Sequence, residues 1–219
     1  MALPFQHKSA MKLLVPIGSM GFVILASNTL VQYPLSGNFL GIDLSAILTW
    51  GAFTYPIAFL VTDSTNRVFG YRFARRVVAF GFAFGVALTL LAALGIAISA
   101  SRDTSVSIWQ VFWNDPESLS MLRIALASGT AFLVAQLVNI NIFDRLRQKI
   151  WWKAPTASSF TGSLIDTVIF FSIAFVGTGM PWASWAIGDF CAKLLMMILL
   201  LYPFKILVGY YPNSLRFSN

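Results

Sequence analysis

Six long apolar stretches, separated by short polar segments, dominate the pattern of hydrophobic and polar positions along the chain. A membrane-spanning helix needs about 20 mainly apolar residues to cross a hydrocarbon core of about 30 Å. Each stretch has about this length, so the pattern predicts an all-α membrane protein with six transmembrane helices, formed by residues 1–219 as a single domain. The predicted spans are 11–32, 44–62, 77–98, 119–140, 158–178 and 182–203.

Acidic, amide and lysine side chains interrupt these apolar stretches. A charged group at the centre of a membrane helix costs roughly 2.5–3.5 kcal/mol, so such groups usually face a protein interior, a water-filled cavity or a substrate. We therefore expect a polar site inside the helix bundle. The polar residues within or next to the spans are Asn28, Asp63, Asn66, Gln136, Asn139, Asp166, Asp189 and Lys193.

The composition agrees with a chain that mostly faces lipid. Hydrophobic residues make up 58% of the chain and charged residues 11%, whereas a soluble domain carries about 25% charged residues. The single cysteine, Cys191, excludes an intrachain disulfide, and the single histidine, His7, excludes a histidine-based metal site. We therefore expect no metal and no cofactor.

The net charge of +7 reflects the positions of the basic loops. Twelve of the fifteen lysines and arginines fall in the N-terminal leader, the loops 67–76 and 145–153, and the C-terminal tail. The alternate loops together hold a single cation, Arg102. By the positive-inside rule the basic segments and both termini are cytoplasmic. Basic loops facing anionic lipid headgroups explain the charge without a nucleic-acid partner.

Three further segments need an interpretation. The first span follows a basic leader, as in a signal peptide, but it exceeds the roughly 7–15 apolar residues of a cleaved one, so we expect it to be retained. The loop 99–118, which carries three aromatic residues, is expected to lie at the outer membrane interface, where tryptophan is enriched. Those residues are Trp109, Phe112 and Trp113. Trp151 and Trp152 are expected to form a similar belt on the cytoplasmic side.

The strongest local signal runs from the second span into the first basic loop. Pro56 is expected to disturb the helix, because proline lacks an N–H and clashes with the preceding turn. If the helix continues past Asp63, then Asp63, Asn66, Arg67 and Gly70 share one face. The alternative is a surface ion pair between Asp63 and Arg67 beside a loop glycine.

A second signal opens the fifth span, where Ser159, Gly162, Ser163 and Asp166 follow the spacing i, i+3, i+4 and i+7. Small residues also allow helices to pack closely, which is an alternative explanation for Gly162 and Ser163. It does not cover Asp166, because an unpaired buried carboxylate takes up a proton or finds a donor. We therefore expect Asp166 to be functional.

The fourth and sixth spans carry polar residues with two interpretations each. Asp189 and Lys193 have the i, i+4 spacing of a helical ion pair, which either neutralises both charges or serves binding and coupling. Gln136 and Asn139 are either ligands or interhelical hydrogen bonds, typically worth about 0.6 kcal/mol each.

These residues, taken together, resemble the signatures of the queuosine precursor transporters, a small bacterial family of vitamin-uptake-type carriers. The resemblance covers nearly the whole chain, including the stretch from Gln136 to Phe143. Arg67 departs from the pattern, since an acidic residue often follows the asparagine, and Gly162-Ser163 replaces a common Ser-Gln pair. The matching motifs are Thr54-Tyr55-Pro56, Thr62-Asp63, Asn66, Gly70, Ala74-Arg75 and Ser163-Leu164-Ile165-Asp166-Thr167.

The resemblance implies import of 7-deazaguanine precursors of queuosine, the cyano or aminomethyl base, across the bacterial inner membrane. Such a base offers N–H donors to carboxylates, a carbonyl to amides and a flat face to aromatic rings. Pockets of this kind are mostly apolar with a few placed polar groups. The expected substrate-binding residues are Asp166, Asp63, Asn66, Gln136, Asn139, Ser163 and Tyr55. Asp189 and Lys193 are the candidates for coupling.

Other function classes remain open to different degrees. No phosphate-binding GxxxxGK[ST] motif is present, so the chain itself does not hydrolyse ATP by such a site, but six-span vitamin binders can dock on separate ATPase modules. A non-transporting membrane scaffold is a further alternative. An enzyme is disfavoured, because the sequence has neither HExxH nor GxSxG. The expected partners are the lipid bilayer and a nucleobase-like molecule, with a homo-oligomer left open.

Overall fold

A computed structural model describes residues 5–31, 33–39, 41–101 and 116–210. Long helices make up most of this part of the chain, so the expectation of an all-α protein is confirmed. The helices are α1 (Phe5–Leu30), α2 (Gly51–Thr54), α3 (Ile57–Phe69), α4 (Tyr71–Ser101), α6 (Pro116–Leu146), α7 (Lys153–Phe175) and α8 (Trp182–Gly209). Strands β1 (Asn38–Phe39) and β2 (Ile42–Asp43) pair in an antiparallel hairpin, which the 3-10 helix η1 (Leu44–Ala46) follows.

The second predicted span differs most from the structure. Residues 44–62 do not form one continuous helix: the chain passes through η1, then α2, and is interrupted at Tyr55-Pro56 before α3, where the disturbance was predicted. Pro56 has no N–H to donate to the preceding turn, which explains the interruption. The helix then continues past Asp63 to Phe69, as the first interpretation of this segment required, and Gly70 ends it with a φ of +90°.

The other helices match their predicted spans but are longer at one or both ends. α4 begins at Tyr71, six residues before the predicted start, and α6 continues to Leu146. α7 begins at Lys153 and α8 continues to Gly209. The apolar run marks the hydrocarbon core of about 30 Å, whereas a helix extends into the headgroup regions, which widen the bilayer to about 40–45 Å.

Four helices in the described part of the chain are long and apolar enough to cross a membrane. Large apolar side chains on their outward faces are exposed, for example Ile198 of α8 at 61%. Such a surface is stable only against lipid, so the chain is a multi-pass membrane protein. The four segments are Tyr71–Leu91, Arg123–Leu146, Lys153–Phe175 and Trp182–Gly209, and Leu14–Leu30 of α1 is a shorter apolar helix.

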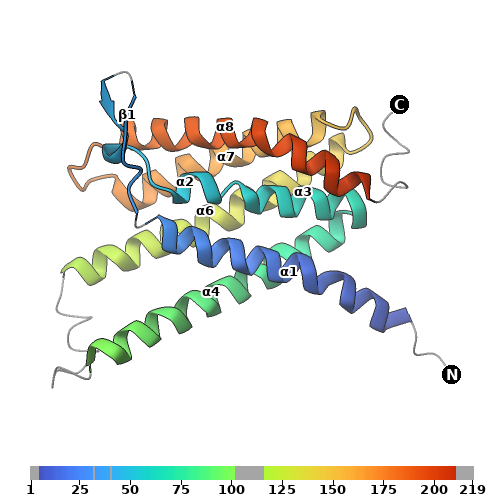
Figure 1. Cartoon of the computed structure of the whole chain (residues 1–219), viewed down its shortest axis with the longest axis horizontal. Helices are drawn as coiled ribbons and strands as arrows, with labels where there is room; N and C mark the ends of the chain where they lie inside the picture. The colour runs from blue at the N-terminus through green and yellow to red at the C-terminus, as the bar shows by residue number, and fades with distance from the viewer. Residues whose placement is uncertain (1–4, 32, 40, 102–115, 211–219) are drawn as a thin grey trace.

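The helices form a bundle in which α3 is central and contacts α1, α4, α6, α7 and α8 (Figure 1). α6 packs most extensively on α7, and α1 crosses α4 on the outer side of the bundle. The start of α1, the α3–α4 turn, the α6–α7 loop and the end of α8 all lie toward the same end of the molecule (Figure 1). The segments rich in arginine and lysine therefore gather at one end.

Glycines allow α1 and α4 to approach closely. A Cβ added to Gly81 would lie 2.5 Å from Met20, and one added to Gly85 would lie 2.7 Å from Ile24. Gly81 and Gly85 have the GxxxG spacing, which brings two membrane helices together through van der Waals contact. Met20 and Ile24 belong to the larger apolar core of the bundle, which also includes Phe132 of α6.

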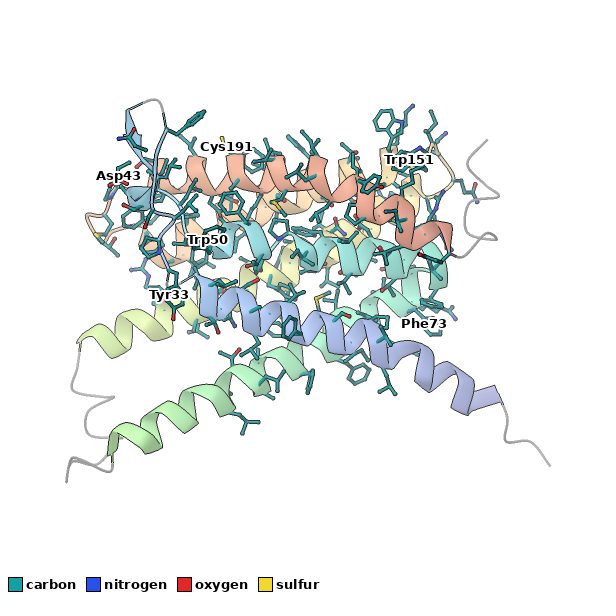
Figure 2. All side chains as sticks on the ribbon, in the orientation of Figure 1. Tyr33, Asp43, Trp50, Phe73, Trp151 and Cys191 are labelled. Carbon is teal, nitrogen blue, oxygen red and sulfur yellow. The ribbon has the colours of Figure 1, made fainter. Side chains whose placement is uncertain are left out.

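Aromatic side chains lie at both ends of the bundle. Tyr33 and Trp50 lie at the end that carries β1, and Trp151 lies at the opposite end (Figure 2). Of the pair that we expect to form a cytoplasmic belt, Trp152 is exposed and Trp151 is half-buried. Such a distribution is typical of the two membrane interfaces. The expected interfacial residues of the loop 99–118 lie outside the described residues: Trp109, Phe112 and Trp113.

Candidate functional site

Polar side chains are buried where α3, α6, α7 and α8 meet. Each helix has an apolar outer face, and its polar positions turn inward because lipid cannot hydrogen-bond to them. The spacing expected for α7 is confirmed, since Ser159, Gly162, Ser163 and Asp166 are all buried. Asp63 and Asn66 of α3 are also buried, at 1% and 0% exposure. These residues form two clusters on either side of a pocket.

The first cluster, which we name the Asp63 cluster, consists of Asp63, Asn139, Ser158 and Ser159. Asn139 Nδ2 donates to Asp63 Oδ1 at 2.6 Å. The hydroxyls of Ser158 and Ser159 donate to Asp63 Oδ2 at 3.3 and 3.2 Å. These donors are neutral, and among the described residues no cation forms an ion pair with Asp63. Asp63 is thus held by hydrogen bonds alone.

Two further predicted residues lie behind this cluster, between α3 and α6. Thr62 Oγ1 donates to Gln136 Oε1 at 2.7 Å, and Asn66 Nδ2 donates to the carbonyl of Ile140 at 3.1 Å. Both amides therefore join α3 to α6, as the packing interpretation of Gln136 expected. One buried amide atom in each of Asn66, Gln136 and Asn139 nevertheless lacks a protein partner, an arrangement that costs roughly 1–3 kcal/mol for each group. These atoms are Asn66 Oδ1, Gln136 Nε2 and Asn139 Oδ1.

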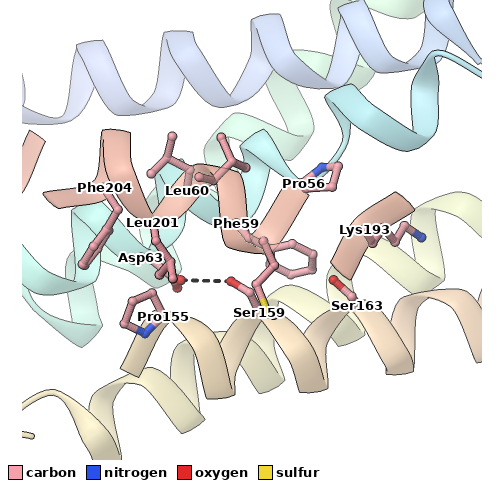
Figure 3. Close-up of a pocket in the computed structure, with 12 residues that line it drawn as sticks. Pro56, Phe59, Leu60, Asp63, Pro155, Ser159, Ser163, Lys193, Leu201 and Phe204 are labelled. Atoms are coloured by element: carbon pink, nitrogen blue, oxygen red, sulfur yellow. Dashed lines mark hydrogen bonds between the residues drawn. The ribbon is translucent and has the colours of Figure 1, made fainter. Parts of the chain in front are cut away.

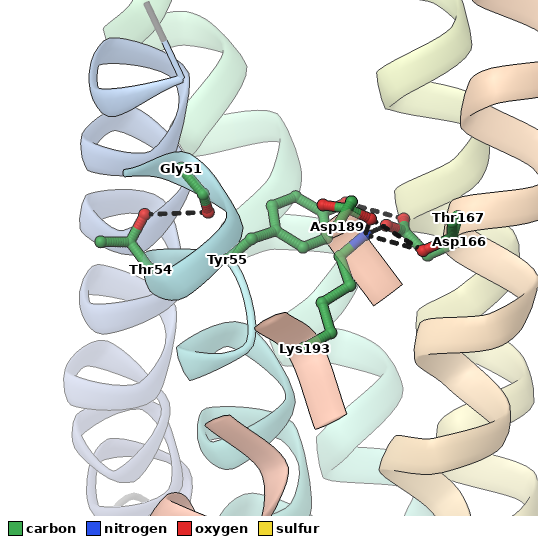
Figure 4. Close-up of polar contacts among 7 residues, drawn as sticks. All are labelled: Gly51, Thr54, Tyr55, Asp166, Thr167, Asp189 and Lys193. Atoms are coloured by element: carbon green, nitrogen blue, oxygen red, sulfur yellow. Dashed lines mark hydrogen bonds and ion pairs between the residues drawn. The ribbon is translucent and has the colours of Figure 1, made fainter. Parts of the chain in front are cut away.

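The second cluster, which we name the Lys193 network, surrounds the ammonium group of Lys193. Lys193 Nζ lies 2.7 Å from Asp166 Oδ2 and 2.5 Å from Asp189 Oδ2. It also lies 3.2 Å from Thr167 Oγ1, whose hydroxyl donates to Asp189 Oδ2 at 2.8 Å. Figure 4 shows Asp166 and Thr167 reaching Lys193 from α7, while Asp189 reaches it from α8.

Tyr55, at the interruption between α2 and α3, completes the Lys193 network. Its hydroxyl donates to Asp166 Oδ1 at 3.2 Å, and the centre of its ring lies 5.5 Å from Lys193 Nζ (Figure 4). The i, i+4 pair expected within the sixth span is present, but it is not self-contained. Lys193 also binds Asp166, the carboxylate for which the sequence offered no nearby cation.

A small pocket lies between the two clusters. Asp63 and Ser159 are on its wall at one end, and Ser163 and Lys193 are on its wall at the other (Figure 3). The rest of its surface is apolar. The lining residues are Pro56, Phe59, Leu60, Asp63, Pro155, Ser159, Ser163, Lys193, Met197, Leu200, Leu201 and Phe204.

The structure sorts the nine predicted site residues by position. Asp63, Ser163 and Lys193 line the pocket, whereas Asn66, Gln136 and Asn139 are not among its lining residues. The others, Tyr55, Asp166 and Asp189, join the Lys193 network. Sequence reasoning missed the contacts that Thr62, Ser158 and Thr167 make. Each of these residues lies next to a residue that was singled out, and this adjacency is the signal that could have found them.

The surface ion pair proposed as an alternative for Asp63 and Arg67 is wrong. Both side chains are 1% exposed, and they turn to different partners. Arg67 donates through Nη1 to the carbonyl of Arg147 at the end of α6, and Arg147 Nη2 donates to the carbonyl of Arg67 at 3.0 Å. Each guanidinium thus binds a carbonyl at the C-terminal end of the other helix, where positive charge is favoured.

The described residues contain no group of three or more His, Cys, Asp or Glu side chains placed to hold a metal ion. The acids near the pocket are instead held by hydrogen-bond donors and one ammonium group. These groups can donate and accept hydrogen bonds and bind protons.

Comparison with known proteins identifies the relatives of this chain. Residues 49–208 match the family described as "Putative vitamin uptake transporter". The chain is 39% identical over 199 residues to a "Probable queuosine precursor transporter" of Haemophilus influenzae, an alignment that covers 83% of this chain and 80% of that protein. It is also 39% identical over 188 residues to the "Queuosine precursor transporter" of Escherichia coli, covering 83% of this chain and 79% of the relative.

A more distant relative is a "Probable queuosine precursor transporter" of Bacillus subtilis, 28% identical over 136 residues that cover 59% of this chain and 57% of that protein. No solved structure shows a significant match. The resemblance seen in the sequence motifs is confirmed by these matches. The chain belongs to the vitamin uptake transporter family, in the same group as the queuosine precursor transporters of E. coli and H. influenzae.

Proposed function

We propose that this protein imports queuosine precursors, 7-deazaguanine bases in the cyano or aminomethyl form, across the bacterial inner membrane. Relatives that align with 79–80% of their own length carry the name queuosine precursor transporter. The observation that carries the proposal is the pocket between the two polar clusters, enclosed by apolar helices. Transport by a carrier, rather than an enzymatic reaction, is the function that such a site performs.

The chemistry of the pocket fits a flat base with several N–H donors. Asp63 and Ser159 offer oxygen atoms at one end, and Phe59 and Phe204 offer aromatic surface along the wall. Ligand pockets are typically of this kind, mostly apolar with few polar groups that fix orientation. Of the predicted substrate-binding residues, we assign contact with the base to Asp63 and Ser163, which line the pocket. Asn139 holds Asp63, and Asn66 and Gln136 join α3 to α6 behind it. Tyr55 and Asp166 belong to the Lys193 network.

We propose a topology of six spans with both termini in the cytoplasm. α1 and the interrupted segment α2–α3 would supply the two crossings beyond the four long apolar helices. The hydrogen bond between Arg147 and Arg67 places the two basic segments that follow α3 and α6 at the same end of the bundle. Under the positive-inside rule this basic end faces the cytoplasm. All 219 residues would then belong to a single transmembrane domain.

Uptake by living cells tests this function. Cells unable to make the precursor base, and lacking their own carrier, should accumulate the labelled base when they express this chain and should regain queuosine in their tRNA. Cells that carry an empty vector are the control. Equal labelling of the two strains, with the protein present in the membrane, would refute the proposal.

One alternative is a substrate-binding component that docks on a separate ATPase module. Reconstitution of the purified chain alone into liposomes separates the two cases. A carrier exchanges labelled base across the bilayer without any further protein, whereas a component of an energy-coupled importer binds the base but does not move it.

A further inference from the structure

Asp63 and Asp166, the buried aspartates of the two clusters, differ in their electrostatic situation. Asp166 has the ammonium of Lys193 at 2.7 Å, and Lys193 is also 2.5 Å from Asp189. Asp63 has neutral donors alone, from Asn139, Ser158 and Ser159. A buried charge is costly unless it is paired, so the two aspartates cannot be equivalent as ligands for an incoming molecule.

We propose that Asp63 is the carboxyl group that receives the N–H donors of the base, and that the Lys193 network does not bind the base but carries the proton that drives its uptake. This inference rests on the proposed function and moves Asp166 and Tyr55, which the sequence grouped with Asp63 as substrate-binding residues, to the coupling task of Asp189 and Lys193.

Asp63 has the position and the free capacity for this role. It lies on the pocket wall beside Ser159, and its carboxyl oxygens hold three neutral hydrogen bonds out of about four acceptor sites. A serine hydroxyl can rotate away when a better donor arrives, because it is both a donor and an acceptor. The adjacent ring N–H and amino group of a guanine-type base are such donors. Together they can form two parallel hydrogen bonds to the Asp63 carboxylate, which fixes the orientation of the base.

Asp166 and Asp189 differ from Asp63 in both position and charge. Neither is among the residues that line the pocket. The Oδ2 atoms of both are paired with the ammonium of Lys193, and the two carboxylates also accept from Tyr55 and Thr167. A neutral N–H of the base would have to displace an ammonium group, and hydrogen bonds between ionised partners are roughly twice as strong as neutral ones. Exchange of that kind is unfavourable, so the network remains closed to the base.

The same network can carry one proton. One ammonium shared by two carboxylates leaves a net charge of −1 in the bundle when both acids are ionised, and one added proton removes it. The proton enters from the external solution onto one of the two carboxylates, while Lys193 stays an ammonium and holds the other. It leaves to the cytoplasm, so one positive charge crosses with each base.

Among the described residues, the ionisable groups in contact with the network are its own members, and Asp63 of α3 shares the pocket wall with Lys193. Tyr55 reaches the network from the α2–α3 interruption, Asp166 from α7, and Asp189 and Lys193 from α8.

Lys193 connects the two tasks because it belongs to the network and also lines the pocket. A base seated against Asp63 therefore lies beside the side chain that holds both coupling carboxylates. Binding and proton uptake can influence each other without sharing a ligand.

Purified protein in liposomes tests the division with two assays on labelled aminomethyl or cyano 7-deazaguanine. Counterflow measures exchange of labelled for unlabelled base and needs no driving force. Accumulation driven by an inward proton gradient needs coupling. The variants are Asp63→Asn, Asp166→Asn and Asp189→Asn, and Asp144→Asn, an exposed acid near the end of α6, is the matched control.

We expect Asp63→Asn to lose both activities, with base binding weakened at least about tenfold, because one acceptor becomes a donor facing the donors of the base. Asp166→Asn and Asp189→Asn should retain counterflow within about threefold, since removal of one charge leaves Lys193 a partner, but should lose accumulation driven by the proton gradient. Asp144→Asn should resemble the unaltered protein in both assays.

Loss of counterflow in Asp166→Asn to the level of Asp63→Asn would overturn the division, and so would normal proton-driven accumulation in both network variants. Accumulation driven by a sodium gradient instead would overturn the assignment of the proton. Failure of the proposed function is distinct from all of these, because the unaltered protein would then show no counterflow of the base.

Discussion

The hydroxyl of Tyr55 donates a hydrogen bond of 3.2 Å to Asp166, across 111 positions of the chain. Tyr55 directly precedes Pro56, so this contact joins the interruption between α2 and α3 to the middle of α7. Broken helices in transporters often lie at the binding site, because irregular backbone at membrane depth is tolerated where it is buried in protein or lines a cavity. A movement of α2 relative to α3 would therefore change the contact between Tyr55 and Asp166 in the Lys193 network.

Tyr55→Phe tests this connection. The substitution keeps the ring beside Lys193 and removes the hydroxyl that binds Asp166, a change worth about 0.5–1.5 kcal/mol. We expect uptake to fall several-fold at normal membrane abundance. Tyr202→Phe, at an exposed position of α8, is the control. Equal uptake by the two variants would mean that the contact is incidental.

Lys193→Met should destabilise the folded protein as well as reduce its transport rate. The substitution leaves Asp166 and Asp189 buried or partly buried without their shared cation, and breaking such a pair typically costs about 3–5 kcal/mol. We expect a large loss of folded protein in the membrane, measured by abundance and thermal stability, whereas Lys205→Met on the exposed side of α8 should have little effect.

The contacts of Lys193 also determine how replacing Asp189 and Lys193 together should affect stability. If Asp189 and Lys193 neutralised only each other, replacing both with apolar residues would be harmless. Because Lys193 also binds Asp166, the double variant still leaves one carboxylate uncompensated. We expect stability to return only when Asp166→Asn is added; recovery in the double variant alone would show that Asp166 does not depend on Lys193.

Gly162→Ala should disturb the pocket wall. The added Cβ would lie 2.8 Å from the Phe59 ring, which lines the pocket, and 3.4 Å from Asn139 of the Asp63 cluster. We expect weaker base binding, because the Phe59 ring, which lines the pocket with Asp63, must shift to make room for the Cβ. Gly18→Ala is the matched control, since nothing lies within 4 Å of its added Cβ. Titration of base binding to the two purified variants measures the difference.

The reciprocal contact of Arg67 and Arg147 should stabilise the basic end of the bundle. Each single change to alanine removes one hydrogen bond to a helix-end carbonyl, an effect of about 1 kcal/mol, and the double change should cost less than the two single costs added together. Thermal unfolding of purified protein measures these costs, with Arg145→Ala at an exposed position as the control. Strict additivity would mean that the two side chains act independently.

Cysteine labelling tests the proposed orientation. After Cys191→Ser, a cysteine at Ser36 in the segment before β1 should react with a membrane-impermeant reagent added to intact cells. A cysteine at Lys149, in the loop between α6 and α7, should react only after the membrane is opened. The reverse pattern would invert the topology and contradict the positive-inside assignment.

The sequence by itself determined the all-α membrane class, because the length of an apolar run and the cost of buried charge are local properties that need no knowledge of contacts. It also located the helix disturbance at Pro56, since proline affects its own turn. The polar stripe on α7, from Ser159 to Asp166, followed from helical periodicity alone. Each of these inferences depends on residues close together in the chain.

Only the tertiary structure decided which polar groups meet. Spacing showed an ion pair of Asp189 with Lys193, but Lys193 lies 27 positions from Asp166, and no local rule could join them. The partners of Asp63 come from α6 and α7, more than 70 positions away, and the partner of Arg67 is a carbonyl at the end of α6. Helix packing decides which buried carboxylates pair with a cation and which one lines the pocket without a cation. The reason is that electrostatic and hydrogen-bond energies depend on distances in space rather than on separation along the chain.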